Sequence, residues 1–212
     1  MIVTIDGPAA SGKGTLARRI AAHYRLPHLD TGLLYRAVAA ALLRANRSLD
    51  DGAAAAVAAR AVEIETLDPT RLSGAALGEA ASRVGAIPEV RAALLKLQQD
   101  FARRPGGAVL DGRDTGTVIA PQAEAKIFVT ASPEARARRR HRELVERGEH
   151  VAYEAVLADI KRRDARDAGR AIAPLKPASD AVLLETTELD IEAAFRAALS
   201  IVEAVRAGRG RS

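Results

Sequence analysis

Residues 2–19 read IVTIDGPAASGKGTLARR and place flexible glycines between two regular elements. The first four residues are apolar or β-branched, which is typical of a buried strand. From Lys13 onward, the spacing of Leu16, Ile20 and Ala21 predicts a helix with one apolar face. The glycines therefore fall at a strand-to-helix junction, where the backbone itself can hold a ligand.

Gly7, Gly12 and Lys13 have the spacing G-x-x-x-x-G-K, which in this context is typical of a phosphate-binding loop. Glycine lets several N–H groups turn toward one anion, and the dipole of the following helix adds positive potential. Lys13 can reach the β- and γ-phosphate oxygens of a nucleotide. The weaker alternative is a glycine-rich turn with an exposed lysine. We expect ATP to contact the whole loop, namely Gly7, Pro8, Ala9, Ala10, Ser11, Gly12, Lys13, Gly14 and Thr15.

The loop departs from the general motif at one position. Gly14 stands where the motif has serine or threonine, and the hydroxyl comes one residue later, at Thr15. The usual direct hydroxyl ligand to Mg²⁺ is therefore missing. We expect no direct protein ligand to the metal, which should be held by nucleotide oxygens and water.

Apolar periodicity along the rest of the chain predicts alternating strands and helices. Strands are expected at 2–6, 108–112, 125–131 and 181–187, and helices at 13–24, 33–44, 53–65, 88–101, 134–147, 151–168 and 191–206. Strands separated by helices favour parallel pairing, so the expected fold class is an α/β sandwich with three layers.

The predicted elements also suggest how one domain of 212 residues is organised. The core is assigned to 1–35, 101–133 and 171–206. The helical interval of about 36–100 is too long for one crossover and is interpreted as an insert. The basic stretch of about 134–170 is interpreted as a lid region, and 207–212 as a flexible tail.

Composition excludes several classes of site. The chain has no cysteine, which excludes disulfides, thiolate metal sites and a cysteine nucleophile. Its four histidines share no metal-ligand spacing and are interpreted as surface or helix-end residues; they are His23, His28, His141 and His150. No apolar run approaches the roughly 18 residues that span a bilayer, and residues 1–5 lack the features of a signal peptide. A cytoplasmic protein without a membrane partner is expected.

The net charge leaves two interpretations open. Lysine and arginine number 32 against 27 acidic residues, a formal charge of +5. The excess can be a nucleic-acid footprint or a set of arginines gathered around a small, highly anionic ligand. The positions of the arginines must decide between them.

Two clusters combine hydroxyl, acidic and basic residues. The segment DTGLLYR (30–36) places Thr31 at a helix start and Arg36 about one turn later, which suits a second phosphate but is also an ordinary helix cap. The segment LDGRDTGTVI (110–119) puts Asp111, Arg113 and Asp114 just past the carboxyl end of a strand. Open α/β sheets bind ligands at that edge.

A third cluster lies in RARRRHRELVERG (136–148) and KRRDARDAGR (161–170). On a helix, the first set of arginines spreads around the whole circumference, so no flat polyanion can engage them all. A solvated charged helix explains many of them, with Arg139 expected to pair with Glu143. The second set, which includes Arg163 and Arg170, has the composition of a mobile lid that brings arginines over phosphates.

The ordered set of motifs resembles the bacterial cytidylate kinases, a family of nucleoside monophosphate kinases. The resemblance runs along nearly the whole chain, through IDGPAASGKGT, DTGLLYR, AASRVGAIPEVR, LDGRDTGTVIAP, AKIFVTAS and IKRRDARDAGRAIAPL. It implies a P-loop core with a five-stranded parallel sheet, a monophosphate-binding insert and a short lid. It also implies transfer of the ATP γ-phosphate to CMP or dCMP, with Mg²⁺ as cofactor, by a monomer that binds no nucleic acid.

The resemblance assigns roles to matching positions. The CMP phosphate is expected at Thr31, Arg36, Arg113 and Arg170. Cytosine is expected at Ser82, Arg91 and Asp114, and the pentose at Arg163 and Asp167. The expected catalytic residues are Lys13, Asp111, Arg113, Arg163 and Arg170, with Arg139 or Arg140 closing over ATP.

One stretch departs from the family pattern. The segment between Glu63 and Leu77 is shorter than usual and lacks a typical strand-forming sequence, so the small sheet of the insert is expected to be trimmed or absent. The competing hypotheses are another small-molecule kinase, such as an adenylate or shikimate kinase, and a basic nucleic-acid-binding P-loop protein. Few aromatic residues (3%) argue against the latter, because they leave few stacking platforms.

Overall fold

The computed structural model describes residues 1–209, and its centre is a five-stranded sheet. The sheet order is β2-β3-β1-β4-β5, and every neighbouring pair is parallel. The strands are β1 (Ile2–Asp6), β2 (His28–Asp30), β3 (Ala108–Gly112), β4 (Ala125–Thr130) and β5 (Val182–Glu185). The predicted α/β class and five-stranded parallel sheet are confirmed, and all five carboxyl ends lie at one edge of the sheet.

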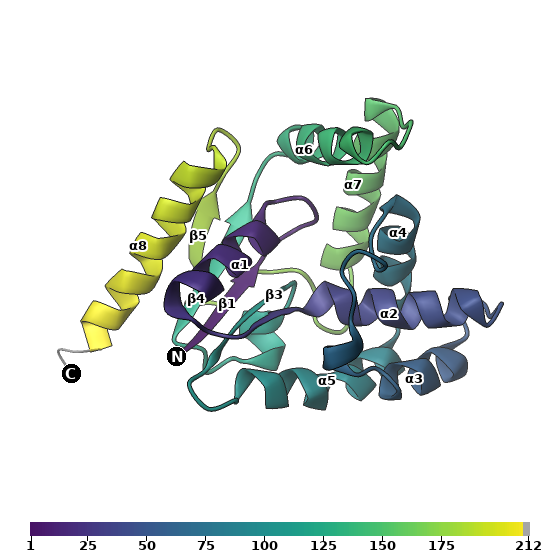
Figure 1. Ribbon diagram of the computed structural model, residues 1–212, viewed down its shortest axis with the longest axis horizontal. Coiled ribbons are helices and arrows are strands. Elements are labelled where there is room, and N and C mark those ends of the chain that lie inside the picture. The colour runs from purple at the N-terminus through teal and green to yellow at the C-terminus, as the bar shows by residue number, and fades with distance from the viewer. Residues whose placement is uncertain (210–212) are drawn as a thin grey trace.

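Two helices, α1 (Lys13–Tyr24) and α8 (Ile191–Arg209), cover one face of the sheet (Figure 1). Alternate side chains of a strand point to opposite faces. On this face, Val3 and Ile5 of β1 pack in one cluster with Leu16 and Ile20 of α1. The packing fixes α1 with its first turn, and the glycine loop before it, at the carboxyl edge of β1.

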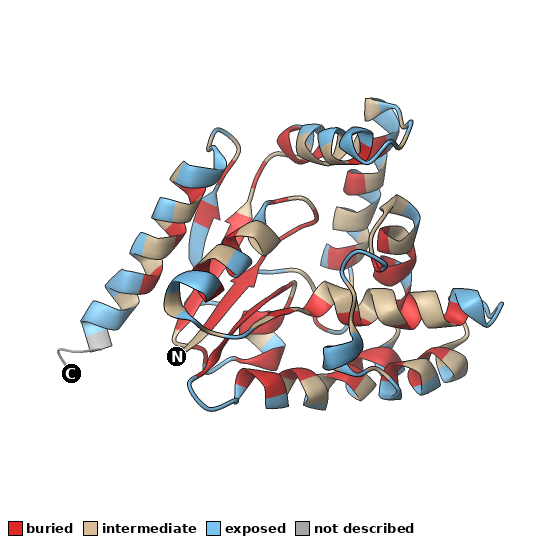
Figure 2. Ribbon diagram, viewed as in Figure 1, coloured by how far each residue is buried: buried red, intermediate tan, exposed pale blue. Residues whose placement is uncertain are grey.

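The other face carries α2 (Thr31–Arg44), α3 (Gly52–Arg60), α4 (Ala75–Val84) and α5 (Pro88–Ala102). A cluster that includes Leu34, Val38, Leu94 and Leu110 joins these helices to β2 and β3. Figure 2 shows the central strands buried between the layers, while the outer sides of the covering helices are exposed. Among the described residues, no strand lies between β2 and β3, so the insert is helical apart from its loops.

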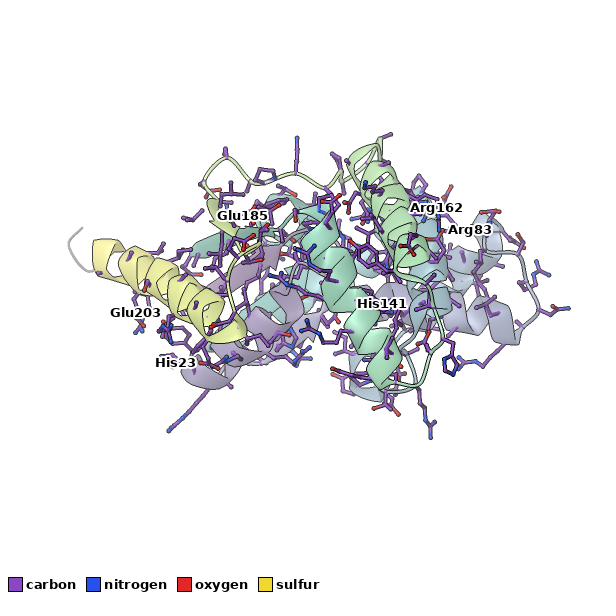
Figure 3. All side chains as sticks on the ribbon, turned by 90° about the horizontal axis from the view of Figure 1, so that it is seen from above. His23, Arg83, His141, Arg162, Glu185 and Glu203 are labelled. Atoms are coloured by element: carbon purple, nitrogen blue, oxygen red, sulfur yellow. The ribbon has the colours of Figure 1, made fainter. Side chains whose placement is uncertain are left out.

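Helices α6 (Pro133–Glu146) and α7 (Tyr153–Ala168) form a hairpin beyond the carboxyl edge of the sheet (Figure 1). The Ser132 hydroxyl caps α6 by accepting from the Ala135 amide, 3.2 Å away, as the sequence predicted. A small cluster of Ala137, Leu144, Val156 and Ile160 packs the two helices together. Figure 3 shows the pair from above, with His141 on α6 and Arg162 on α7.

Several elements differ from the predictions. Strand β2 was not predicted, because three residues are too few for a periodic signal. The helix expected at 53–65 ends at Arg60, and a 3₁₀ turn, η1 (Ile64–Thr66), follows it. Helix α8 extends to Arg209, so the predicted tail is helical over 207–209, and 210–212 lie outside the described residues. No helix in the described part of the chain has the length and apolarity to cross a membrane.

Candidate active site

The loop between β1 and α1 is held against the sheet by close backbone contacts. A Cβ on Gly7 would lie 2.1 Å from the carbonyl oxygen of Val129, so only glycine fits there. Gly12 has φ of 90°, a left-handed conformation that glycine adopts without strain. Lys13 folds back along the loop, and its Nζ donates to the carbonyl of Pro8 over 3.3 Å. The geometry matches the anion-binding turn that the sequence predicted.

The Lys13 ammonium is strongly desolvated and lies among both arginines and carboxylates. Burial lowers its pKa to about 7, and the charge of Arg113 acts in the same direction. The carboxylates of Asp111 and Asp30 oppose the shift but do not reverse it. An anion arriving at the loop would favour the charged form, so binding and protonation of Lys13 are coupled.

A buried carboxylate, Asp6, connects the loop to the turn after β3. Asp6 accepts from the Thr115 amide (2.9 Å), the Thr115 hydroxyl (2.8 Å) and the Gly116 amide (2.8 Å). These groups belong to η2 (Thr115–Ile119), a π-helical turn that directly follows Asp114. Burial raises the pKa of Asp6 to about 6, and the three hydrogen bonds limit the rise.

A polar cleft of about 350 Å³, here called the arginine cleft, opens between the carboxyl edge of the sheet, the insert and α7. Its lining includes every residue that was predicted to bind the acceptor nucleotide, contributed by six different segments. They are Thr31, Arg36, Ser82, Arg91, Arg113, Asp114, Arg163, Asp167 and Arg170, together with Lys13 and Asp111. The fold therefore brings together residues that are up to 157 positions apart, Lys13 and Arg170 being the extremes.

Asp167 accepts hydrogen bonds from three other residues of the cleft. Arg113 Nε donates to it over 2.8 Å, Arg170 over 2.6 Å and the Ser82 hydroxyl over 3.3 Å. Burial alone would raise the pKa of Asp167, but the charges of Arg113 and Arg170 lower it below its usual value. The carboxylate thus stays ionised and holds two arginines side by side.

A second buried ion pair joins Arg91 of α5 to Asp114. Their side chains are only 9% and 5% exposed, and Arg91 also donates to the carbonyl of Gly85 over 3.2 Å. The ring of Tyr35 lies 5.6 Å from the Arg91 guanidinium, and burial raises the pKa of this tyrosine to about 12. This end of the cleft therefore presents a carboxylate, a guanidinium and an aromatic face.

Arg163 and Arg36 form fewer hydrogen bonds within the protein than Arg113 and Arg91 do. Within the described structure, Arg163 Nε is buried without a hydrogen-bond partner, and its nearest carboxylate, Asp159, is 3.9 Å away. Burial lowers the pKa of Arg163 to about 10, and the charge of Arg113 adds to the effect. Arg36 donates to the carbonyl of Leu72 over 3.2 Å. Both cations retain donors that a phosphate or a sugar hydroxyl can satisfy.

A second hollow of about 1030 Å³, here called the outer groove, lies between the loop, α6 and the start of α8. Its lining includes Ser11 to Thr15 together with Arg139, Arg140, Thr186 and Asp190. Lys13, Gly14 and Arg140 line both hollows, which therefore meet at the glycine loop.

The two arginines that were expected to close over ATP occupy different places. Arg140 pairs with Glu143 over 2.8 Å and lines both hollows. Arg139 donates to the hydroxyl of Thr186 over 3.2 Å and to the carbonyl of Thr186. The predicted pairing of Arg139 with Glu143 is therefore wrong, because Arg139 turns toward the loop after β5 (Glu185 marks the end of this strand in Figure 3).

Several lining residues escaped the sequence analysis. Asp30, Tyr35 and Arg18 line the arginine cleft, and Arg18 also lines the outer groove. The motif DTGLLYR contained the first two, so their proximity to Thr31 and Arg36 was an available signal. His28 was interpreted as a surface or helix-end residue, which is wrong. It lies on β2, with Nε2 2.8 Å from Asp111 Oδ1.

Two polar hollows that share Lys13 suit a reaction in which a phosphoryl group passes between two bound molecules. The fold and the site thus define a P-loop phosphotransferase with a phosphate-bearing acceptor. The cytidylate kinase family model matches residues 3–204. The chain therefore belongs to the cytidylate kinase family, whose members are nucleoside monophosphate kinases.

Individual relatives agree with the family match. A cytidylate kinase of Xanthobacter autotrophicus is 68% identical over 209 residues, which cover 99% of this chain and all of the relative. A cytidylate kinase of Methylocella silvestris is 66% identical and covers 96% of this chain and 94% of its own. A crystal structure of an uncharacterized protein from Eubacterium ventriosum has a TM-score of 0.57 at 14% identity, covering 96% of this chain and 98% of its own. That structural likeness shows the fold alone.

Proposed function

We propose that the protein transfers the γ-phosphate of ATP to CMP, and also to dCMP, to give ADP and the nucleoside diphosphate. The observation that carries the proposal is the meeting of the arginine cleft and the outer groove at Lys13. A lysine at that point can accompany the phosphoryl group from donor to acceptor, because it faces both hollows.

ATP is placed in the outer groove. The amides of Gly7 to Thr15 and the first turn of α1 would hold its phosphates, as helix N-termini commonly do. Arg140 is positioned to reach the γ-phosphate, since it lines both hollows. Arg139 also lines this groove, beside Thr186 and the carbonyl of Ser11, and would contact the bound nucleotide there.

CMP is placed in the arginine cleft. Its phosphate would lie among Thr31, Arg36, Arg113 and Arg170, all of which line the cleft. The pentose would lie against Arg163 and Asp167, where Arg163 Nε has no partner in the described structure. The cytosine would face Ser82, Arg91 and Asp114, which line the same cleft.

The base-reading end suits cytosine by its polarity. Cytosine offers an N4 amino donor beside N3 and O2 acceptors, which a carboxylate and a guanidinium can satisfy together. Uracil has a carbonyl at position 4 and would face the buried Asp114 with a second acceptor. A site that leaves a buried carboxylate unpaired discriminates strongly against such a ligand.

The residues near the loop fit an Mg²⁺ ion that is bound mainly through the phosphate oxygens of the nucleotide. Magnesium keeps several waters and is held through one or two carboxylates plus phosphate oxygens. No cluster of three or more His, Asp or Glu side chains suited to a metal occurs within residues 1–209. Asp111, a carboxylate next to Gly14, would orient a metal-bound water. Mg²⁺ when bound would neutralise charge between the β- and γ-phosphates.

The residues of the site supply alignment and positive charge rather than a general base. A CMP phosphate oxygen is already ionised near neutral pH and attacks without losing a proton. Arg113, Arg163 and Arg170 would neutralise the charge of the in-line transfer, with Lys13 on the donor side. Closure of α6 and α7 over both hollows would exclude water and prevent hydrolysis of ATP.

A coupled ADP-release assay across CMP, dCMP, UMP, AMP and GMP tests the proposal. We expect the highest kcat/KM with CMP, comparable turnover of dCMP, and weak turnover of UMP. A preference for AMP would indicate an adenylate kinase and would refute the assignment of Asp114. Lys13→Ala should abolish most turnover without unfolding the protein.

We further propose that the protein acts as a monomer in the cytoplasm without nucleic acid. Both hollows are lined by one chain, and the substrates are cytoplasmic nucleotides. Size-exclusion chromatography with light scattering should give the monomer mass of 22.3 kDa. A gel-shift titration at physiological salt should show no complex with RNA or DNA, whereas steeply salt-dependent binding would support the competing hypothesis.

A further inference from the structure

His28 lies beside the site without lining either hollow. The register of β2 with β3 pairs Asp30 with Asp111 and His28 with Val109. Paired residues in a parallel sheet point to the same face, and so do residues two apart on one strand. Val109 packs in the cluster beneath α1, so all four side chains occupy the face that α1 covers.

The carboxylate of Asp111 is held through one oxygen and presents the other to the loop. Its side chain is 3% exposed, and Oδ1 lies 2.8 Å from Nε2 of His28. Oδ2 faces the loop, because a Cβ placed on Gly14 would lie 3.5 Å from it. An ionised carboxylate can only accept hydrogen bonds, so Nε2 carries the proton in this pair.

A neighbouring carboxylate makes this orientation depend on His28. Asp30 and Asp111 are register partners on neighbouring strands. Burial raises the pKa of Asp30, and the charge of Asp111 raises it further. Two adjacent buried carboxylates repel each other unless donors satisfy them. Asp30 accepts a hydrogen bond from the Gly32 amide over 2.9 Å. His28 is the corresponding hydrogen-bond donor to Asp111.

We propose that His28 is a positioning residue for phosphoryl transfer: it holds Asp111 with Oδ2 directed at the phosphate-binding loop. The inference rests on the proposed function, in which Asp111 orients water around the nucleotide-bound cation. His28 contacts neither substrate and acts through Asp111. Gly14 keeps the space between that oxygen and the loop open.

Steady-state kinetics of three variants test this role. His28→Leu removes the donor and should lower kcat about tenfold, the lower end of the effect seen when partners of metal-site ligands are removed. KM for CMP and for ATP should stay within about twofold, because His28 lines neither hollow. His28→Gln retains an N–H donor of similar reach and should recover most of kcat. Leu29→Ala, on the opposite face of β2, is the control for destabilisation alone.

A double-mutant cycle shows whether the effect passes through Asp111. In the Asp111→Ala background, His28→Leu should cause no further loss of kcat. Calorimetric titration with ADP, with and without Mg²⁺, gives a readout that does not require turnover. The gain in ADP affinity from Mg²⁺ should shrink in His28→Leu and persist in Leu29→Ala.

The inference is overturned if His28→Leu retains wild-type kcat, if His28→Gln is as impaired as His28→Leu, or if the two losses in the cycle are additive. A wild-type protein inactive on every monophosphate would instead refute the proposed function. The ADP titrations would still test the coupling of His28 to the loop in that case.

Discussion

Nucleotide binding should take up a proton at Lys13. Burial favours the neutral amine and lowers the pKa of Lys13 to about 7, whereas a bound phosphate favours the ammonium. With that pKa, about 0.1 of the lysines are neutral at pH 6 and about 0.9 at pH 8. If only the charged form binds phosphate, Kd for ADP should rise about tenfold from pH 6 to pH 8, and binding at pH 8 should take up about 0.9 proton.

Isothermal titration calorimetry measures both quantities. Titrations of Mg²⁺-saturated ADP in buffers of different ionisation enthalpy give the number of protons taken up, since the metal keeps the phosphates ionised across this range. Lys13→Arg is the matched control, because arginine remains protonated at both pH values. Its affinity should be independent of pH. The reasoning fails if the wild type takes up no proton at pH 8, or if both proteins show the same dependence on pH.

Three further outcomes follow from other contacts. Asp114→Asn, which keeps an acceptor toward Arg91, should raise KM for CMP at least about tenfold while leaving the Kd for ATP unchanged; equal loss of both would contradict base reading. Gly7→Ala should abolish ADP binding and lower Tm, because its Cβ would lie 2.1 Å from a backbone oxygen; an unchanged Tm would count against that contact. Asp6 has its folded-state pKa raised from 3.8 to about 6, so it stabilises most at low pH. The unfolding free energy of the wild type should fall by about 3 kcal/mol relative to Asp6→Asn between pH 3.5 and pH 7 in urea titrations.

Much of the fold could be predicted because its signals are local. The apolar run before Gly7 and the periodicity after Lys13 fixed β1 and α1 to the residue. Strand β2 escaped because its three residues contain one buried position, Leu29, and two polar ones. A strand that short is recognised only by its pairing with β3, which local sequence does not encode.

The sequence predicted many of the residues that line the arginine cleft but not how they are arranged. The motifs supplied the candidate residues. Only the folded chain reveals that Asp167 accepts hydrogen bonds from both Arg113 and Ser82, although Ser82 lies 85 positions before Asp167. The sequence also could not show which arginines of α6 are paired inside the protein and which line a hollow. Arg136 is 3% exposed and donates to Asp164 and to the carbonyl of Ala9, so it ties the hairpin of α6 and α7 to the glycine loop. Charge spacing alone treats Arg136 and Arg140 alike.

The ion pairs around Asp167 and Asp114 determine how the cleft interacts with small anions. Arg113 and Arg170 both form ion pairs with Asp167, and Arg91 forms an ion pair with Asp114. A phosphate or sulfate ion must therefore compete for these three arginines with contacts that they already make. A nucleotide bound as proposed would contact several of these side chains at once, so we expect the cleft to select ligands by molecular shape as well as by charge.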